Sequence, residues 1–273
     1  MSDNINLKIP DKTIDKAYDD LLHPVASETG KLLGRVTRAL NAAFAPLDQW
    51  ILQREMNVAQ TKKTLEDKLA YANPEKIVTP EPYVAVPALQ YISYSISNKE
   101  LYDLYANLLS KAMYADTKEK VHPSFVEIIK QLSPADALVL KEFTKSKEPI
   151  AAARMSIILR TKGLQLIGQP KQVRYSLELV SDIQIDTLSE EQIQVSVDNL
   201  KRLGLITLSD FSLSENNKYA FVKNTSLYSR FQQEFESLNQ IENTAERISI
   251  DQKILSLTSI GELFCNICIL GFE

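Results

Sequence analysis

The chain has 273 residues, of which 44% are hydrophobic and 24% charged, and its formal net charge is −4. This length suits one large or two modest domains, since domains usually hold ~100 to 200 residues, and we expect two. The apolar content is sufficient for packed cores. The chain has only seven glycines, and this small number excludes a fibrous or loop-rich chain. The acidic balance excludes a general attraction of the whole surface to nucleic acid or anionic lipid, because that attraction needs a surplus of lysine and arginine.

The chain shows no pattern typical of secreted or membrane-spanning proteins. Its two cysteines cannot form a disulfide framework, and its first residues lack the basic-then-apolar order of a signal peptide. We therefore expect a cytoplasmic protein. The most apolar stretch, residues 32–52, is interrupted by charged and amide side chains, which predicts a packed amphipathic helix rather than a span. A helix lying on a membrane surface is the alternative interpretation of this stretch.

The first 130 residues read as a loosely attached segment followed by a helical domain. Residues 1–30 are polar and contain prolines, whereas from Lys31 apolar side chains recur every three or four residues, which predicts a helix. A long, partly exposed helix is expected over residues 47–72. Four prolines between positions 74 and 87 predict an ordered, extended strap, because each fixes its own φ and disfavours helix at its predecessor.

Three further helices are predicted in succession. The strongest pattern covers residues 98–113, with Ser97 and Glu100 as a capping box. His122 and the proline after it predict the start of the next helix, and Ser133 with its proline predicts the end of that helix and the cap of a third. Short connections favour antiparallel neighbours. The helical domain is thus expected to span residues 31–130.

Beyond Glu148 the pattern changes and predicts a domain of mixed structure over residues 131–273. Strand signals lie at residues 173–179, 205–208 and 219–222, and residues 214–218 predict a hairpin turn. Between them a helix begins at a capping box of Ser189 and Gln192 and ends at Gly204. A last helix is expected over residues 259–270. A helix followed by a hairpin and a later helix resembles a winged-helix arrangement, so the whole chain is expected to be mainly α, with a winged-helix-like α+β domain at its C-terminal end.

Long runs of the sequence resemble one family. Residues 71–113, 121–140, 198–206 (DNLKRLGLI) and 257–268 (LTSIGELFCNIC) are similar to the signature of the abortive-infection alpha family, a bacterial group largely of unknown function. The resemblance implies a part in defence against phage and supplies no catalytic residues. Its characteristic positions have simple structural interpretations here, as loop stiffeners and helix caps; they are Pro80, Pro82, Pro87, Asn107, His122-Pro123 and Ser133-Pro134.

No residue pattern predicts catalysis, a metal site or a cofactor. Cys265 and Cys268 form a C-x-x-C motif, but they lie in an apolar helix and the chain has only two histidines to complete a zinc site, so we expect buried thiols. Each histidine precedes a proline, which leaves few bases for nucleophilic catalysis. No glycine-rich phosphate loop occurs. We therefore expect no enzyme activity.

One uneven feature is a cationic segment, residues 149–177, which contains no Asp or Glu. In a winged-helix interpretation, two basic residues at the end of the helix after Ser189 would join it. The candidate nucleic-acid or phosphate contacts are Arg154, Arg160, Lys162, Lys171, Arg174, Lys201 and Arg202. The alternative is a solvated strand-and-turn region whose charge is balanced in space by distant acids.

Together these patterns predict a non-enzymatic phage-defence protein that acts through protein or nucleic-acid contacts. A protein partner or self-association is expected, because the apolar faces of the helices pack against each other and against a partner molecule. Two alternatives stay open: a nucleic-acid-binding transcriptional regulator of winged-helix type, and an effector that acts on a membrane surface through residues 32–52.

Overall fold

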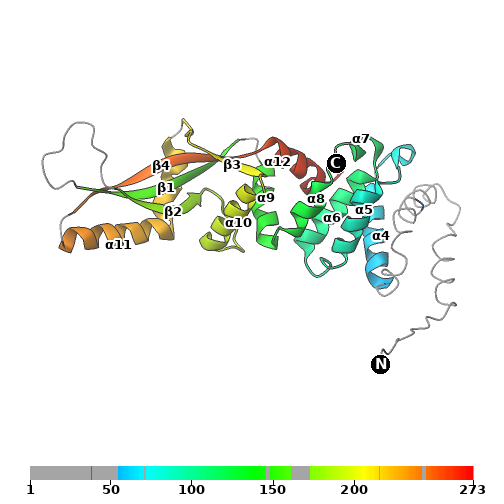
Figure 1. Ribbon diagram of the computed structural model, residues 1–273, viewed down its shortest axis with the longest axis horizontal. Helices are drawn as coiled ribbons and strands as arrows, with labels where there is room; N and C mark the ends of the chain where they lie inside the picture. Colours follow the sequence, from blue (N-terminus) through cyan, green and yellow to red (C-terminus); the bar gives the residue numbers. More distant parts are fainter. Residues whose placement is uncertain are drawn as a thin grey trace, which may run out of the picture. The chain divides into compact units, whose positions relative to one another are not determined.

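The computed structural model describes residues 55–272 apart from 71, 146–147, 161–172, 215 and 242–243, together with Arg38 (Figure 1). The described chain forms two compact units: one ends at Lys130 and is completed by residues from Ile267 on, and the other runs from Gln131 to Asn266. It is mostly helical with a four-stranded antiparallel sheet, and so α+β overall. Apart from Arg38, the predictions for residues 1–54, including the membrane-surface helix, lie outside the described residues.

The first unit is built around α6 (Lys99–Ala112), which contacts α4 (Glu55–Leu69), α5 (Pro82–Ile92), α7 (Ala115–Lys118) and α8 (Ser124–Lys130). A short 3-10 helix, η3 (Pro74–Lys76), lies between α4 and α5. The predicted helix over residues 98–113 is therefore confirmed. The predicted capping box at Ser97 is wrong, because Asn98 is the N-cap and makes no side-chain capping bond. The largest fully buried side chains of this unit include Leu65, Leu69, Ile92, Leu104, Tyr105, Leu108, Phe125 and Ile129.

Part of the predicted proline strap is helical. Helix α5 begins at Pro82, whose fixed φ suits the first turn, and continues through Pro87. Pro87 cannot donate to the main-chain oxygen four residues earlier, which normally breaks a helix. The apolar side of α5 offsets this loss by burying five side chains in the unit core: Val84, Ala85, Ala88, Leu89 and Ile92.

The two predicted helix starts at His122 and Ser133 are confirmed by their hydrogen bonds. The main-chain N–H of Ser124 donates to Nδ1 of His122 at 3.2 Å, so the imidazole occupies a capping position. Ser133 and Asp136 form a reciprocal cap at the start of α9 (Pro134–Lys145): Asp136 N donates to Ser133 Oγ at 3.1 Å, and Ser133 N donates to the Asp136 carboxylate at 2.7 Å. Both arrangements satisfy N–H groups that a helix start leaves without partners.

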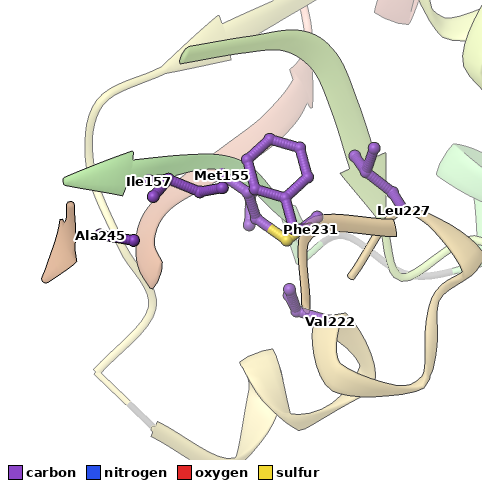
Figure 2. Packing of buried hydrophobic residues seen from close by; sticks show 7 residues of the cluster. Met155, Ile157, Val222, Leu227, Phe231 and Ala245 are labelled. Carbon is purple, nitrogen blue, oxygen red and sulfur yellow. The ribbon is translucent and has the colours of Figure 1, made fainter. Parts of the chain in front are cut away.

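The second unit contains a sheet of four antiparallel strands in the order β2-β1-β4-β3. The strands are β1 (Ile150–Leu159), β2 (Val173–Ser181), β3 (Ile206–Ser209) and β4 (Ala245–Leu257). Helix α11 (Ser226–Ile241) contacts β1 and β4. A cluster of buried side chains from the strands, α11 and the preceding segment forms the core there (Figure 2): Ala153, Met155, Ile157, Val222, Leu227, Phe231 and Ala245. Alternation along β1 leaves Arg154 and Ser156 on the opposite side of the sheet from this cluster.

Helix α10 (Glu190–Arg202) follows the prediction closely. Ser189 and Gln192 form the expected capping box, and the helix ends before Gly204, whose φ of 72° favours glycine. The predicted strand over residues 219–222 is wrong, because these residues belong to a 3-10 segment, η4 (Asn216–Asn224). The predicted hairpin at residues 214–218 is also wrong, since β3 pairs with β4. The hairpin was the basis of the winged-helix prediction, and the described residues do not contain it.

The chain ends in α12 (Ser259–Phe264), which continues as a π-helical turn, Cys265–Ile269, in agreement with the last predicted helix. Thr258 caps α12 by accepting from Gly261 N at 3.0 Å. The interpretation of Asn107 as a loop stiffener or helix cap is wrong. It is buried within α6 and donates its side-chain amide to Cys268 O at 2.8 Å and to Ile269 O at 3.2 Å.

Candidate binding cleft

The structure describes only some of the candidate cationic residues of segment 149–177. Arg154 lies in the middle of β1, opposite Asp251 of β4, whereas Arg160 follows the end of β1 and donates its main-chain N–H to Thr244 O at 2.7 Å. Arg174 occupies β2 opposite Ile157. Lys162 and Lys171 lie outside the described residues. The side chains that are described thus do not establish a common phosphate site.

Lys201 and Arg202 lie together in the last turn of α10, but both have partners within the unit. The ammonium of Lys201 is 3.2 Å from the Asp198 carboxylate. The Arg202 guanidinium donates to Asn199 Oδ1 at 2.8 Å and to Gln131 Oε1 at 3.1 Å. Asn199 in turn donates to Asp136 at 2.8 Å. These contacts join α10 to the start of α9, which gives the two basic residues a structural role.

Arg154 belongs to a polar network on the sheet side opposite the α11 core. Lys253 of β4 lies between two carboxylates, 2.7 Å from Asp210 and 2.6 Å from Asp251. These hydrogen bonds raise the pKa of Lys253. The pKa of Asp210 is lowered by its hydrogen bond to Lys253, by the positive charge of Lys253 and by that of Arg154. The network therefore favours the charged forms of Lys253 and Asp210, and Arg154 contributes to it through its charge.

A cleft of about 500 Å³ is lined by residues of β2, α10 and the start of α11. Its apolar lining comes from all three elements and from the segment after β2, and consists of the buried side chains Leu179, Ile183, Ile193 and Leu227. Val195 of α10 also lines it and is 63% exposed. The volume falls within the ~300 to 1,000 Å³ typical of ligand sites.

The start of α11 is fixed to α10 by one carboxylate. Glu190, in the first turn of α10, accepts from Ser226 N at 2.9 Å and also from the Ser226 hydroxyl. Thr225 completes the cap by accepting from Tyr228 N at 3.2 Å. The negative charge of Glu190 thus lies at the N-terminal ends of two helices, where helix dipoles favour it. This contact positions two walls of the cleft relative to each other.

The polar lining of the cleft is predominantly acidic. It contains four carboxylates, Glu178, Glu190, Glu191 and Asp198, and one guanidinium, Arg230. Arg230 forms an ion pair with Glu178, and Glu190 is occupied by Ser226, so these groups have partners at the rim. Glu191 and Asp198 are both exposed on α10, on either side of Val195. An apolar surface beside exposed carboxylates suits a ligand that carries both apolar groups and positive charge.

Within the described residues, no group of three or more His, Cys, Asp and Glu side chains is arranged to hold a metal ion. Cys265 and Cys268 are buried and form no disulfide, as predicted. Burial raises the pKa of the Cys265 thiol to about 12, which disfavours the reactive thiolate. Among the helices of the described part of the chain, none is long and apolar enough to cross a membrane.

Sequence reasoning missed this cleft because its residues come from segments that are far apart in the chain. One signal was present: Val195 interrupts the polar side of a strongly amphipathic helix, between Glu191 and Asp198. A single exposed apolar residue is common on protein surfaces, so this signal was weak by itself. The predicted basic site lacked this kind of evidence, since basic residues in the last turn of a helix commonly stabilise the helix end.

Comparison with known proteins identifies the family. A sequence profile described as abortive infection alpha matches residues 53–268, which is most of the chain. The chain belongs to the abortive infection alpha family. No curated protein matches this abortive infection alpha protein. A solved structure of an uncharacterized protein from the hydrocarbon-degrading marine bacterium Alcanivorax borkumensis SK2 is similar at 16% identity, with a TM-score of 0.33, and the match covers 54% of this chain and 92% of that one.

Proposed function

We propose that this protein is a non-enzymatic component of abortive infection, and that it acts by binding a protein partner in the acidic cleft of its second unit. Family membership supports the part in phage defence. The cleft supports the mode of action, because it combines an apolar lining, the exposed Val195 and carboxylates on α10. A partner with apolar and basic side chains would bury the former and pair with the latter.

The observation that carries this proposal is the arrangement of Glu191, Val195 and Asp198 on one side of α10. Residues three and four apart lie on the same helix face, so the two carboxylates flank the apolar side chain. Their charge is partly balanced by Lys201, which pairs with Asp198. Solvent-exposed ion pairs of this kind contribute little to stability, so Asp198 can exchange Lys201 for a partner's cation at small cost.

The test is phage challenge of bacterial cells that express the full chain. We expect the wild-type chain to lower the yield of phage together with the survival of infected cells. The double variant Glu191→Lys/Asp198→Lys should lose this effect, because it reverses the charge beside Val195. Glu236→Lys is the matched control, since Glu236 is an exposed glutamate of α11 in the same unit and does not line the cleft.

Thermal unfolding of both purified variants separates a binding defect from a folding defect. Changing Glu191 in the first turn of α10 removes a favourable helix-dipole interaction of about 0.3–1 kcal/mol, so a small shift is expected. Full protection by a folded double variant, or no protection by the wild-type chain against a panel of phages, would contradict the proposal.

A further inference from the structure

One wall of the cleft is formed by a strand at the edge of the described sheet. β2 is the outermost strand, with β1 as its neighbour in the sheet of the described residues. Four consecutive residues of β2, 178–181, line the cleft. An edge strand presents main-chain donors and acceptors on its outer side, and such edges pair readily with an added strand unless they are covered.

The pairing register shows which groups point outward. Asp182 N donates to Ala151 O at 2.9 Å, and Ser181 lies opposite Ala152. In an antiparallel ladder, hydrogen-bonded and non-hydrogen-bonded pairs alternate. Because Asp182 and Ala151 form a hydrogen-bonded pair, the N–H and C=O groups of Ser181 and Leu179 are directed away from β1. The outward side of these two residues is therefore the side that an added strand would use, and Ser181 is the more accessible of the two, because it is half-buried whereas Leu179 is buried.

We propose that the cleft binds an extended, lysine- or arginine-rich peptide segment of a partner protein, which adds to the free edge of β2 as a further strand. This inference rests on the proposed function and specifies its partner. Main-chain bonds to Leu179 and Ser181 give the segment its extended form, as in other cases of strand addition. Side chains on one face of the segment contact the apolar lining and Val195, and basic side chains pair with Glu191 and Asp198.

The charge of the cleft selects this occupant over an acidic or purely apolar segment. Four carboxylates and one guanidinium line it, so a segment with negative charge would meet like charge at close range. The opening toward β2 involves four residues, which suits a strand of similar length. A segment that alternates basic and β-branched residues matches both the pleat of a strand and the two kinds of lining.

The probe is a fluorescein-labelled peptide with the sequence Gly-Lys-Val-Lys-Val-Lys-Gly, blocked at both ends and titrated with the full chain in fluorescence anisotropy. Replacing its lysines by glutamate should abolish binding. Two N-methylated forms provide the decisive comparison, each methylated on the main-chain nitrogens of one side only. Strand addition predicts that one form loses binding at least tenfold while the other stays within about threefold, since only one side of an added strand faces β2.

Protein variants test the same geometry from the other side. Ser181→Pro removes the outward N–H of Ser181 while leaving the ladder bond of Asp182 in place, and should weaken the probe at least tenfold. Glu191→Lys/Asp198→Lys should weaken it similarly, and Glu236→Lys should not. If Ser181→Pro fails to fold, the N-methylated peptides still decide. Equal effects of the two N-methylated forms, or equal binding of the lysine and glutamate peptides, would overturn strand addition.

Failure of strand addition and failure of the proposed function give different combinations of results. Loss of phage defence in the cleft variants, combined with no difference between the N-methylated peptides, leaves the cleft as the functional site and rejects strand addition. Saturable binding of the probe, combined with full defence by the cleft variants, confirms a peptide site and rejects its part in defence.

Discussion

The side-chain amide of Asn107 donates to the main-chain oxygen of Cys268 at 2.8 Å, and these residues are 161 positions apart in the sequence. Asn107 thereby holds the π-helical turn near the C-terminus against the central helix of the first unit. The wider turn of a π-helix needs such support, because it is rarely stable alone. The same amide reaches the next main-chain oxygen, of Ile269.

Replacing Asn107 by Leu should destabilise the protein by about 1–3 kcal/mol, because two main-chain oxygens lose their buried donor. The Oδ1 of Asn107 is buried without a hydrogen-bond partner among the described residues, so its removal offsets part of the loss. Urea denaturation measures the difference. Lys120→Met, at an exposed residue of the same unit, is the control and should change stability by less than about 0.5 kcal/mol. Equal stability of Asn107→Leu and the wild type would contradict the assigned role.

Gly261 should tolerate no side chain. A Cβ at this position would lie 1.9 Å from the main-chain oxygen of Leu205, which cannot move without disturbing the turn after α10. Gly261→Ala is therefore expected to destabilise the second unit by at least about 1–3 kcal/mol. Gly271→Ala is the matched control, because a Cβ there meets nothing within 4 Å. Thermal unfolding of the two variants should show a large shift for the first and a negligible shift for the second.

The thiol of Cys265 should be inert in the folded protein. Burial raises its pKa from 9.0 to about 12, so the thiolate fraction at mildly alkaline pH falls about a thousandfold. We expect iodoacetamide to modify Cys265 only when the chain is unfolded by urea, as followed by mass spectrometry. The folded state favours the neutral thiol. The contribution of Cys265 to stability is therefore fully present below pH 9.0, the pKa of the unfolded thiol, and is lost as the pH rises through about 12. Rapid alkylation of the native protein would contradict this expectation.

The ion pair of Asp210 and Lys253 should be visible in an acid titration. Its hydrogen bond and charge lower the pKa of Asp210 below the usual 3.8. A depressed carboxyl pKa contributes stability that is present above the unfolded value and is lost as the pH falls through the folded value. Lys253→Met should move the pKa of Asp210 back toward 3.8, as measured by the chemical shift of the Asp210 side-chain carboxyl carbon across the titration. An unchanged midpoint would show that the pair does not form in solution.

Helix caps and amphipathic stripes were predictable from sequence because they depend on neighbouring residues. Ser189 and Gln192, Ser133 and the stripe of α6 were all located correctly. Helix α5 was missed because its prolines disfavour a helix locally, whereas the apolar side chains that stabilise the helix do so only by packing in the folded unit. The apolar run at Tyr219 suggested a strand, but the Tyr219 hydroxyl donates to Lys253 O at 3.0 Å and joins a 3-10 segment to β4.

Strands β1 and β4 were missed for different reasons. After its first residue, Ile150, β1 has three alanines, which do not favour a strand. It forms because β2 and β4 pair with it on both sides. β4 does show alternation, with Ile248 and Ile250 toward the α11 core and Ser249 and Asp251 on the other side. Its signal was present in the sequence. The cleft was not predictable, since Glu190 and Ser226 meet there only after β2, α10 and α11 have packed.

The most direct test of the central claim is the efficiency of plating of a sensitive phage on cells that express equal amounts of Glu191→Lys/Asp198→Lys and of Glu236→Lys. If the α10 carboxylates recruit a basic partner, the first variant should restore plating at least tenfold toward that of cells without the protein, and the second should restrict the phage as the wild type does. Equal restriction by both folded variants would contradict a role for this cleft in defence.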